Sequence, residues 1–137
     1  MSRVYTVAVV GGGIGRSHII EGYAPNQDRF KVIAICDLDA GRRDSLADEF
    51  GIERRVANFV ALLAMDDLDI IDICTPPLVH YPMVMAAAKA RKHVICEKPM
   101  ALNAAECDTM IAACKAANVR LSIGYRLHFE PNTQELK

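Results

Sequence analysis

A cluster of glycines lies near the start of the chain, in the run Gly11-Gly12-Gly13-Ile14-Gly15. It follows an apolar stretch of strand length and precedes residues of helix-forming composition. Glycine lets a backbone turn sharply and approach a pyrophosphate closely, while free N–H groups at a helix N-terminus hold the negative charge. The spacing is GxGxG rather than the standard GxGxxG, so we interpret it as a dinucleotide-binding loop shortened by one residue. A tight strand-to-helix turn that binds nothing is the alternative.

The acid Asp37 ends a second apolar run, 22 positions after Gly15. A carboxylate at about this spacing binds the adenosine ribose hydroxyls in dinucleotide-binding folds, although a plain surface carboxylate is the simpler explanation. Because Asp37 would repel a 2′-phosphate, it favours NAD over NADP. Arg42 and Arg43 fall one turn into the next predicted helix, where guanidinium groups could bind a phosphate. NADP therefore stays possible as a cofactor.

Two later apolar runs end in loops that contain proline, Thr75-Pro76-Pro77 and Glu97-Lys98-Pro99. In a parallel sheet covered by helices, the carboxyl ends of the strands line the crevice where ligands bind. There the ammonium of Lys98 could hold a substrate hydroxyl and exchange its proton, and we expect burial to lower its pKa toward useful values. We predict that Lys98 is catalytic. A surface lysine before a turn proline is the alternative.

The four histidines are weaker candidates. His93 lies within an apolar run and is predicted to be structural, while His18 and His80 belong to predicted helices. His128 alone is expected near the crevice, where it is a candidate general base.

The five cysteines form no CxxC pair. Cys36, Cys74 and Cys96 each end an apolar run, but small buried cysteines in neighbouring strands are far commoner than a metal site without ligand spacing. We predict that they pack in the core and that no metal is bound. An odd number of cysteines would leave one thiol unpaired in an oxidising compartment, which favours the cytoplasm.

Short apolar runs rich in Val and Ile alternate with longer segments of helical period, as expected of parallel strands buried on both faces. Strands are predicted over residues 4–10, 31–36, 55–57, 70–74, 93–96 and 119–123. Helices are predicted over residues 14–24, 40–50, 59–65, 79–90 and 104–117, with Gly51 and Asn118 as helix stops. Right-handed crossovers wind such a string into a doubly wound parallel sheet, an α/β Rossmann fold of about six strands.

The length of 137 residues allows one good core but not a second domain of ordinary size. We assign residues 1–124 to a nucleotide-binding domain, and residues 125–137 to the start of a connection toward a substrate domain that is absent. The 16 Lys and Arg nearly balance the 17 Asp and Glu, which excludes the basic surface that nucleic acid requires. No apolar run approaches the length of a membrane span.

Taken in order and spacing, these motifs resemble the glucose-fructose oxidoreductase, inositol dehydrogenase and rhizopine catabolism family, written Gfo/Idh/MocA. The resemblance spans nearly the whole chain, and the Glu-Lys-Pro element is its most specific part. It is carried by the glycine loop with trailing His18, Asp37, Thr75-Pro76 with His80, Glu97-Lys98-Pro99, and Gly124-Tyr125 with Phe129-Glu130-Pro131.

The resemblance implies a role for each matching residue. The pyrophosphate would be held by the glycine loop, the adenosine ribose by Asp37, and Lys98 would reach toward the nicotinamide and the substrate. The cofactor-binding residues that it implies are Gly11, Gly13, Ile14, Gly15, Asp37, Thr75, Pro76, His80, Glu97 and Lys98.

Two departures from the family pattern affect the substrate side. The family often has Arg four residues after the glycine that ends the sixth strand, whereas here that position is His128, with Arg126 two residues earlier. This pattern is closer to the glucose-fructose oxidoreductase branch, so Arg126 and His128 are candidates for contact with a sugar or cyclitol. Family members also continue into an α/β substrate domain, commonly with a catalytic histidine, which is absent here.

The sequence thus predicts the nucleotide-binding domain of an NAD(P)-dependent oxidoreductase. The complete enzyme would transfer hydride between nicotinamide and a secondary alcohol of a sugar, polyol or cyclitol. We also expect a homo-oligomer, because a missing substrate domain would leave apolar surface exposed. A non-catalytic dinucleotide-binding module and a truncated fragment without turnover are the alternatives.

Overall fold

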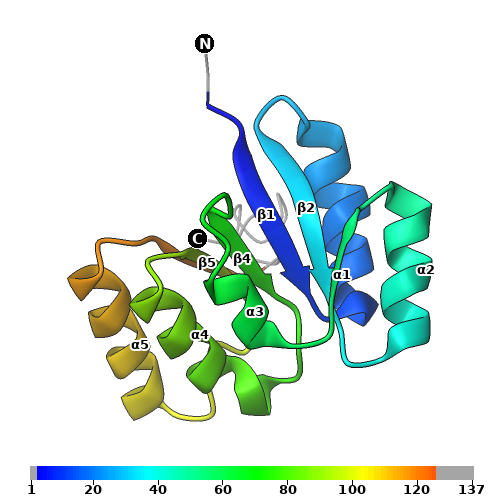
Figure 1. Ribbon diagram of the computed structural model, residues 1–137. Coiled ribbons are helices and arrows are strands. Elements are labelled where there is room, and N and C mark those ends of the chain that lie inside the picture. The colour runs from blue at the N-terminus through cyan, green and yellow to red at the C-terminus, as the bar shows by residue number, and fades with distance from the viewer. Residues whose placement is uncertain (1–2, 126–137) are drawn as a thin grey trace, which may run out of the picture.

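Parallel strands form where Val- and Ile-rich runs can be buried on both faces. They are β1 (Tyr5–Val10), β2 (Phe30–Cys36), β3 (Arg54–Val56), β4 (Ile70–Ile73), β5 (His93–Glu97) and β6 (Leu121–Gly124). The computed structural model, which describes residues 3–125, joins them in one sheet in the order β3-β2-β1-β4-β5-β6 (Figure 1). Every neighbouring pair is parallel. The predicted doubly wound α/β sheet of six strands is therefore confirmed.

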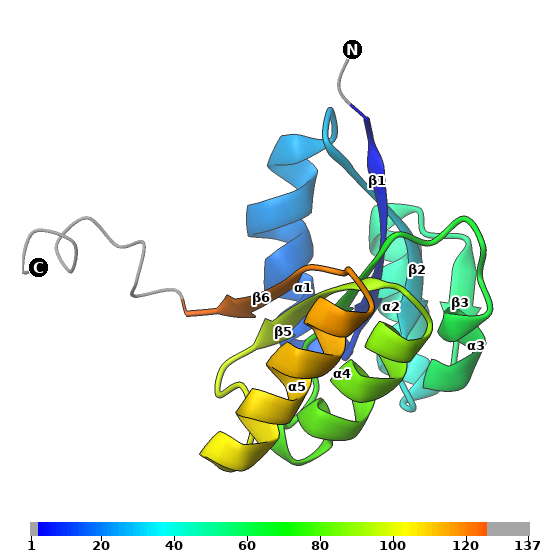
Figure 2. The ribbon, with the colours of Figure 1, turned by 90° about the vertical axis from the view of Figure 1, so that its left-hand side faces the viewer.

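Helices cover both faces of this sheet (Figures 1 and 2). They are α1 (Gly12–His18), α2 (Ala40–Phe50), α3 (Phe59–Leu63), α4 (His80–Lys89) and α5 (Ala104–Ala116), with a π-helix η1 (Ile19–Tyr23) and 3-10 turns η2 (Ala24–Asn26) and η3 (Pro77–Val79). One core packs η1 and α2 against the central strands through Ile19 and Leu46. The other packs α3, α4 and α5 against the opposite face through Leu62, Val84 and Met110.

The predicted helix stops are confirmed. Gly51 and Asn118 both adopt the left-handed conformation, with φ of 67° and 55°. The last strand starts at Leu121, two residues later than predicted, because Val119 N–H is still bonded to the Cys114 carbonyl of α5.

The first helix also differs from the prediction. It begins at Gly12 instead of residue 14, so most of the glycine cluster is itself helical. Past His18 the winding loosens into η1 and then tightens into η2, which ends at Asn26. Within the described part of the chain, no helix has the length and apolar character needed to cross a bilayer.

Candidate dinucleotide-binding and catalytic site

The strand order reverses between β1 and β4, and ligands of doubly wound sheets bind where their carboxyl ends diverge. Gly11 follows β1 directly, with φ of 95°, and its N–H donates to the Cys36 carbonyl at 2.8 Å. A Cβ on Gly11 would lie 2.9 Å from the carbonyl oxygen of Cys74, which follows β4. Both the backbone conformation and the close approach therefore require glycine at this position.

The other glycines of the loop divide into packed and open positions. A Cβ on Gly15 would lie 2.5 Å from Cγ1 of Val9, so this glycine lets α1 pack closely against β1. A Cβ on Gly13 would meet no atom within 4 Å. Among the described residues, the N–H groups of Gly13 and Ile14 have no acceptor, as expected in the first turn of a helix. An anion therefore has both space and donors at Gly13.

Asp37 follows β2 and is 8% exposed. Its Oδ2 accepts hydrogen bonds from Gly12 N–H and from Arg42 Nε, both at 2.8 Å, and its Oδ1 accepts from Asp39 N–H at 2.9 Å. Burial acts to raise the pKa of Asp37, but the bonds from Arg42, Asp39 and Gly12 together lower it below its ordinary value. The carboxylate is thus an anion that fixes the glycine loop to the end of β2.

Arg42 links the predicted NAD determinant to the predicted NADP determinant. Its guanidinium pairs with Asp37 while its side chain is 52% exposed. The neighbouring Arg43 instead bonds the backbone carbonyl of Asp37 at 3.2 Å. A cofactor approaching this end of the site would therefore meet a carboxylate already neutralised by a partly solvated guanidinium.

Apolar side chains border the same edge of the sheet. Leu38, directly after Asp37, is 89% exposed, and Leu78 in the loop after β4 is 71% exposed. Ile14 of the glycine loop is 52% exposed. Large apolar groups that face solvent beside polar donors are typical of ligand sites. The sequence analysis overlooked Leu38 and Leu78, since a single leucine in a loop carries no signal.

His80 is one of the cofactor-binding residues that the family resemblance implied, and it lies between the loops that follow β4 and β5. Its side chain is fully buried, with Nε2 2.8 Å from the Thr75 carbonyl and Nδ1 2.8 Å from the Pro99 carbonyl. The buried ring therefore connects the loop after β4 to the loop after β5 through these two contacts. Thr75 is half-buried and Pro76 is exposed, so these two residues present the surface that a dinucleotide could contact.

Lys98 follows β5 at the same edge of the sheet. Because β4 lies between β1 and β5, Lys98 is farther from the glycine loop than the loop after β4 is. Its side chain is exposed, so the burial that we expected is not found. Its backbone N–H donates to Oε2 of Glu97 at 3.1 Å, and its bond to Pro99 is cis. The turn leaves Lys98 exposed at the carboxyl edge of the sheet.

A buried polar cluster supports this turn and was missed by the sequence analysis. His18, at the end of α1, has Nδ1 2.7 Å from Oδ2 of Asp72 and Nε2 2.7 Å from Oε1 of Glu97. Asp72 belongs to β4 and is fully buried, and its Oδ2 also accepts from the Tyr23 hydroxyl at 2.7 Å. Cys74 Sγ lies 3.3 Å from His18 Nδ1. These short distances are those of hydrogen bonds between the side chains themselves, so we interpret the cluster as a hydrogen-bonded network.

The signal for this network was present in the sequence. Asp72 is a lone acid inside the run Ile70-Ile71-Asp72-Ile73, and a charge there must have partners once the strand is buried. His93 bonds Arg120 N–H at 3.0 Å and packs its ring edge-on to Tyr5, which confirms its structural role. Arg126 and His128, the substrate-side candidates, lie outside the described residues.

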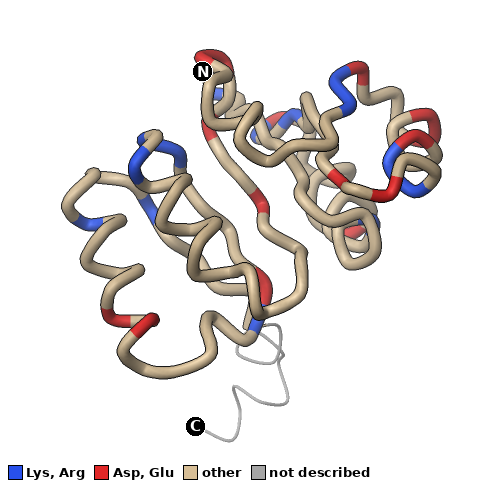
Figure 3. Tube along the Cα trace, turned by 60° about the horizontal axis from the view of Figure 1, so that its bottom comes forward, with Lys and Arg blue, Asp and Glu red and all other residues tan. Residues whose placement is uncertain are grey.

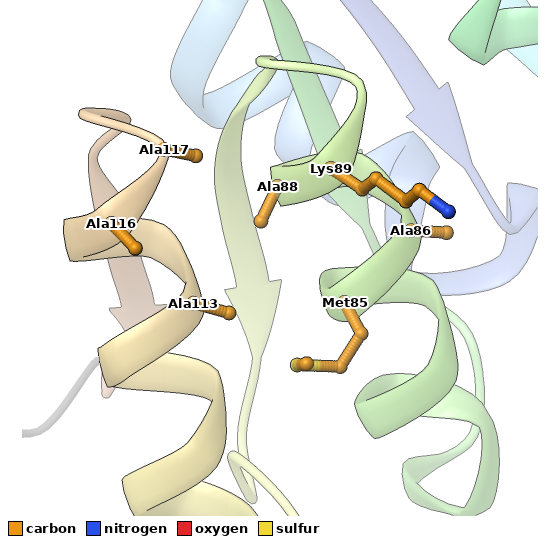
Figure 4. Close-up of a pocket in the computed structure, with 7 residues that line it drawn as sticks. All are labelled: Met85, Ala86, Ala88, Lys89, Ala113, Ala116 and Ala117. Carbon is orange, nitrogen blue, oxygen red and sulfur yellow. The ribbon is translucent and has the colours of Figure 1, made fainter.

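A groove of the described surface lies elsewhere. It runs between α4 and α5 and is lined by Met85, Ala86, Ala88, Lys89, Ala113, Ala116 and Ala117 (Figure 4). Its residues belong to the middle and carboxyl-terminal parts of both helices, away from the loops that follow the strands. It therefore takes no part in the candidate site.

A family model described as "Oxidoreductase family, NAD-binding Rossmann fold" matches residues 5–125. The chain belongs to this family, Gfo/Idh/MocA. The resemblance carried by the motifs is thereby confirmed, and with it the NAD-binding character of the fold.

Individual relatives agree with this assignment. "Uncharacterized oxidoreductase YrbE" of Bacillus subtilis is 36% identical over 100% of this chain and 40% of its own length. Myo-inositol 2-dehydrogenase of Thermotoga maritima is 36% identical over 76% of this chain and 31% of its own length. The crystal structure of the WlbA dehydrogenase from Bordetella pertussis, in complex with NADH and UDP-GlcNAcA, superimposes with a TM-score of 0.81 at 27% identity. It is matched over 90% of this chain and 36% of its own, so the chain spans well under half of each of these proteins.

Proposed function

We propose that the chain forms the dinucleotide-binding half of an oxidoreductase that acts on a secondary alcohol of a sugar, polyol or cyclitol. The open position over Gly13, at the point where β1 and β4 diverge, is the observation that carries this proposal. A bound nicotinamide dinucleotide supplies the hydride acceptor or donor. The substrate class is supported by the inositol and sugar-nucleotide relatives.

Different residues at the carboxyl edge of the sheet would bind different parts of the cofactor. The N–H groups of Gly13 and Ile14 would hold the pyrophosphate, because they lie in the first turn of a helix and have no acceptor among the described residues. Asp37 and Arg42 would bind the adenosine ribose, and exposed Leu38 would contact the adenine. NAD is the expected cofactor, with NADP accepted where Arg42 turns to a 2′-phosphate.

Lys98 would act at the other end of the crevice, with Glu97 beside the nicotinamide. Its ammonium would hold the substrate hydroxyl and exchange a proton with it, since a positioned acid or base near the reacting oxygen accelerates such steps. Thr75 and Pro76 would line the space between the two ends. In this proposal, Asp37 binds the cofactor and Lys98 takes part in proton transfer to or from the substrate.

Titration of the 137-residue chain with NAD+, NADH and NADP+ by calorimetry tests the binding half of the proposal. We expect both NAD forms to bind at one site and NADP+ to bind about tenfold more weakly, the cost of one unfavourable charged contact. Absence of binding would refute the proposal. A parallel assay with sugars and polyols separates an enzyme from a binding module, and binding without turnover is expected for the chain alone.

We also propose a homo-oligomer in the cytoplasm. The surface of α4 carries a single charged residue, Lys89, whereas charges gather on α2 (Figure 3), and the groove between α4 and α5 is lined mainly by alanine. Such a face is suited to a second copy of the chain. All five cysteines are free, in keeping with a reducing compartment. Sedimentation that shows only monomer at high micromolar concentration would argue against assembly.

A further inference from the structure

The buried cluster connects the two ends of the candidate site. His18 ends α1, the helix that starts at the glycine loop, and bridges Asp72 of β4 and Glu97 of β5. These residues are 54 and 79 positions away from His18 in sequence, so the contacts exist only because α1 crosses this part of the sheet. The glycine loop and the lysine turn thus share one rigid link.

The geometry around His18 accommodates two N–H donors on the ring. Both ring nitrogens of His18 lie 2.7 Å from carboxylate oxygens, and two ionised carboxylates accept only if both nitrogens carry hydrogen. Asp72, although fully buried, accepts from the Tyr23 hydroxyl and from Cys74 Sγ as well. Both oxygens of Asp72 therefore have a donor, and the contacts are those expected of an imidazolium between two carboxylates.

Electrostatics support the same charge state. The hydrogen bond to Asp72 raises the pKa of His18 to about 9, burial opposes this, and Glu97 adds to the rise. Burial, followed by the charge of Asp72, raises the pKa of Cys74, so its thiol stays protonated and can donate. The groups that contact His18 are thus two carboxyl groups and the Cys74 thiol, and the Tyr23 hydroxyl contacts Asp72 behind them.

The link continues from His18 to the backbone of Lys98. One oxygen of Glu97 accepts from His18 and the other accepts from Lys98 N–H at 3.1 Å. Space for this arrangement depends on Gly124 of β6, where a Cβ would lie 3.2 Å from Oε1 of Glu97. Glu97 therefore has little freedom to turn away while His18 holds it.

We propose that His18 is a positioning residue: as an imidazolium it holds the Glu97 carboxylate, and through it the Lys98 turn, in register with the glycine-loop helix. The structural claim stands on these contacts alone, whereas its relevance to hydride transfer rests on the proposed function. His18, which follows the glycine loop in sequence, thus acts at the lysine end of the site.

The proposal predicts which bond is lost when the ring becomes neutral. A neutral imidazole keeps one N–H, and fully buried Asp72 cannot exchange that donor for water without a large cost. Glu97, with its side chain 20% exposed, can be solvated instead. Deprotonation of His18 should therefore release Glu97 and loosen the Lys98 turn while Asp72 keeps its partners.

Nuclear magnetic resonance of the labelled 137-residue chain between pH 6 and 10 tests this coupling. Long-range proton–nitrogen spectra report the protonation of the His18 ring. Carbon-detected spectra report the chemical shift of the backbone nitrogen of Lys98, even at high pH. We expect both ring nitrogens to be protonated at pH 7, and the His18 ring, the Glu97 carboxyl carbon and the Lys98 nitrogen to titrate with one midpoint near pH 9.

Three variants separate positioning from mere structural support. His18→Gln and Glu97→Gln should each abolish the transition at Lys98, and Glu97→Gln should also lower the pKa of His18. Tyr23→Phe, the matched control, removes a donor to Asp72 but leaves the bridge from His18 to Glu97, so its transition at Lys98 should persist. Because two independent variants break the link, failure of one to fold leaves the other to decide.

A ring that is neutral at pH 7 would overturn the proposal, and so would a Lys98 signal that titrates unchanged in both glutamine variants. A calorimetric titration with NAD+ on the same samples keeps the two proposals apart. Loss of the Lys98 coupling with normal NAD+ binding refutes only the role of His18, whereas coupling without any NAD+ binding refutes only the proposed function.

Discussion

The two ends of the candidate site are held in place by different means. At the adenosine end, Asp37 bonds Gly12 N–H and Asp39 N–H, and its ion-pair partner Arg42 is five residues away. At the lysine end, the Glu97 carboxylate is held by His18, which is 79 residues away in sequence and belongs to another element. The first end is built mainly from backbone N–H groups and close glycine packing, and the second from hydrogen bonds between side chains of three separate elements.

This difference determines how each end can fail. Backbone conformation and close packing are insensitive to pH but intolerant of added atoms, as Gly11 and Gly15 show. A network that depends on one imidazolium responds to the loss of a proton. Steric substitutions should therefore separate the two ends as clearly as pH does.

The largest expected effect is the loss of turnover when Lys98 is replaced. It would distinguish a residue needed for the reaction from the residues needed for cofactor binding. In a complete enzyme that carries a substrate domain, Lys98→Ala should lower turnover by roughly a hundredfold or more, as is typical when a positioned proton-transfer group is lost. Cofactor affinity should change by less than about threefold, because the N–H donors of the glycine loop are untouched. Lys98→Arg should not restore turnover, since guanidinium stays protonated. Steady-state kinetics beside an NAD+ titration provide the measurement, and normal turnover of the alanine variant would contradict the assignment.

The second effect is a pH-dependent loss of stability at the lysine end. Folding raises the pKa of His18 from 6.5 to about 9, so its contribution is complete below pH 6.5 and is lost as the pH rises through 9. Two and a half units correspond to about 3 kcal/mol of unfolding free energy at most. Wild type should exceed His18→Gln by this amount at pH 6 and by little at pH 9.5.

Urea denaturation of both proteins at the two pH values measures this difference. The buried thiols also reduce stability in alkali, because burial raises the pKa of Cys36 to about 11 and that of Cys96 to about 12. That loss is shared by both proteins and cancels in the comparison. A difference between wild type and variant that is the same at both pH values would show that His18 is not charged.

The adenosine end could be predicted from the sequence because its determinants are local. A glycine cluster between a strand and a helix, and an acid at the end of the next strand, need only neighbouring residues to fix their places. The helix stops at Gly51 and Asn118 were readable for the same reason. The doubly wound parallel sheet followed from alternating elements and the handedness of crossovers.

The lysine end could be predicted only in part. The Glu-Lys-Pro motif indicated a turn, but the exposure of Lys98 depends on what covers the crevice, which no local pattern states. The partners of Asp72 lie on η1 and at the end of α1, so the periodicity of β4 could not name them. His80 begins α4 in sequence, yet only the spatial adjacency of two loops shows that its ring is buried beneath them.

The third prediction compares two glycines of the same loop. Gly15→Ala should destabilise the chain by about 1–3 kcal/mol, because its Cβ would overlap Val9 in the fully packed core. Gly13→Ala should leave stability unchanged or slightly higher, since its methyl group meets open space. The same methyl group would obstruct the pyrophosphate, so NAD+ affinity should fall about tenfold, roughly 1.4 kcal/mol. Thermal unfolding and calorimetry of both variants test the pair, and equal NAD+ binding by wild type and Gly13→Ala would place the cofactor elsewhere.

The smallest effect concerns the choice between NAD and NADP at the adenosine end. In wild type, Asp37 pairs with Arg42 and would face the 2′ position of a bound cofactor, which should make NADP+ about tenfold weaker than NAD+. Asp37→Ala removes the repulsion between the carboxylate and the 2′-phosphate and frees the Arg42 guanidinium to bind that phosphate. The difference in affinity between NAD+ and NADP+ should therefore narrow. Asp37→Asn keeps an acceptor for Gly12 N–H and gives the same test if the alanine variant folds poorly. Arg42→Ala is the matched control: it should weaken NADP+ further and leave NAD+ within about threefold, because hydroxyl groups need the carboxylate and not the guanidinium. Equal affinities for the two cofactors in wild type, unchanged in all three variants, would remove Asp37 and Arg42 from the cofactor site.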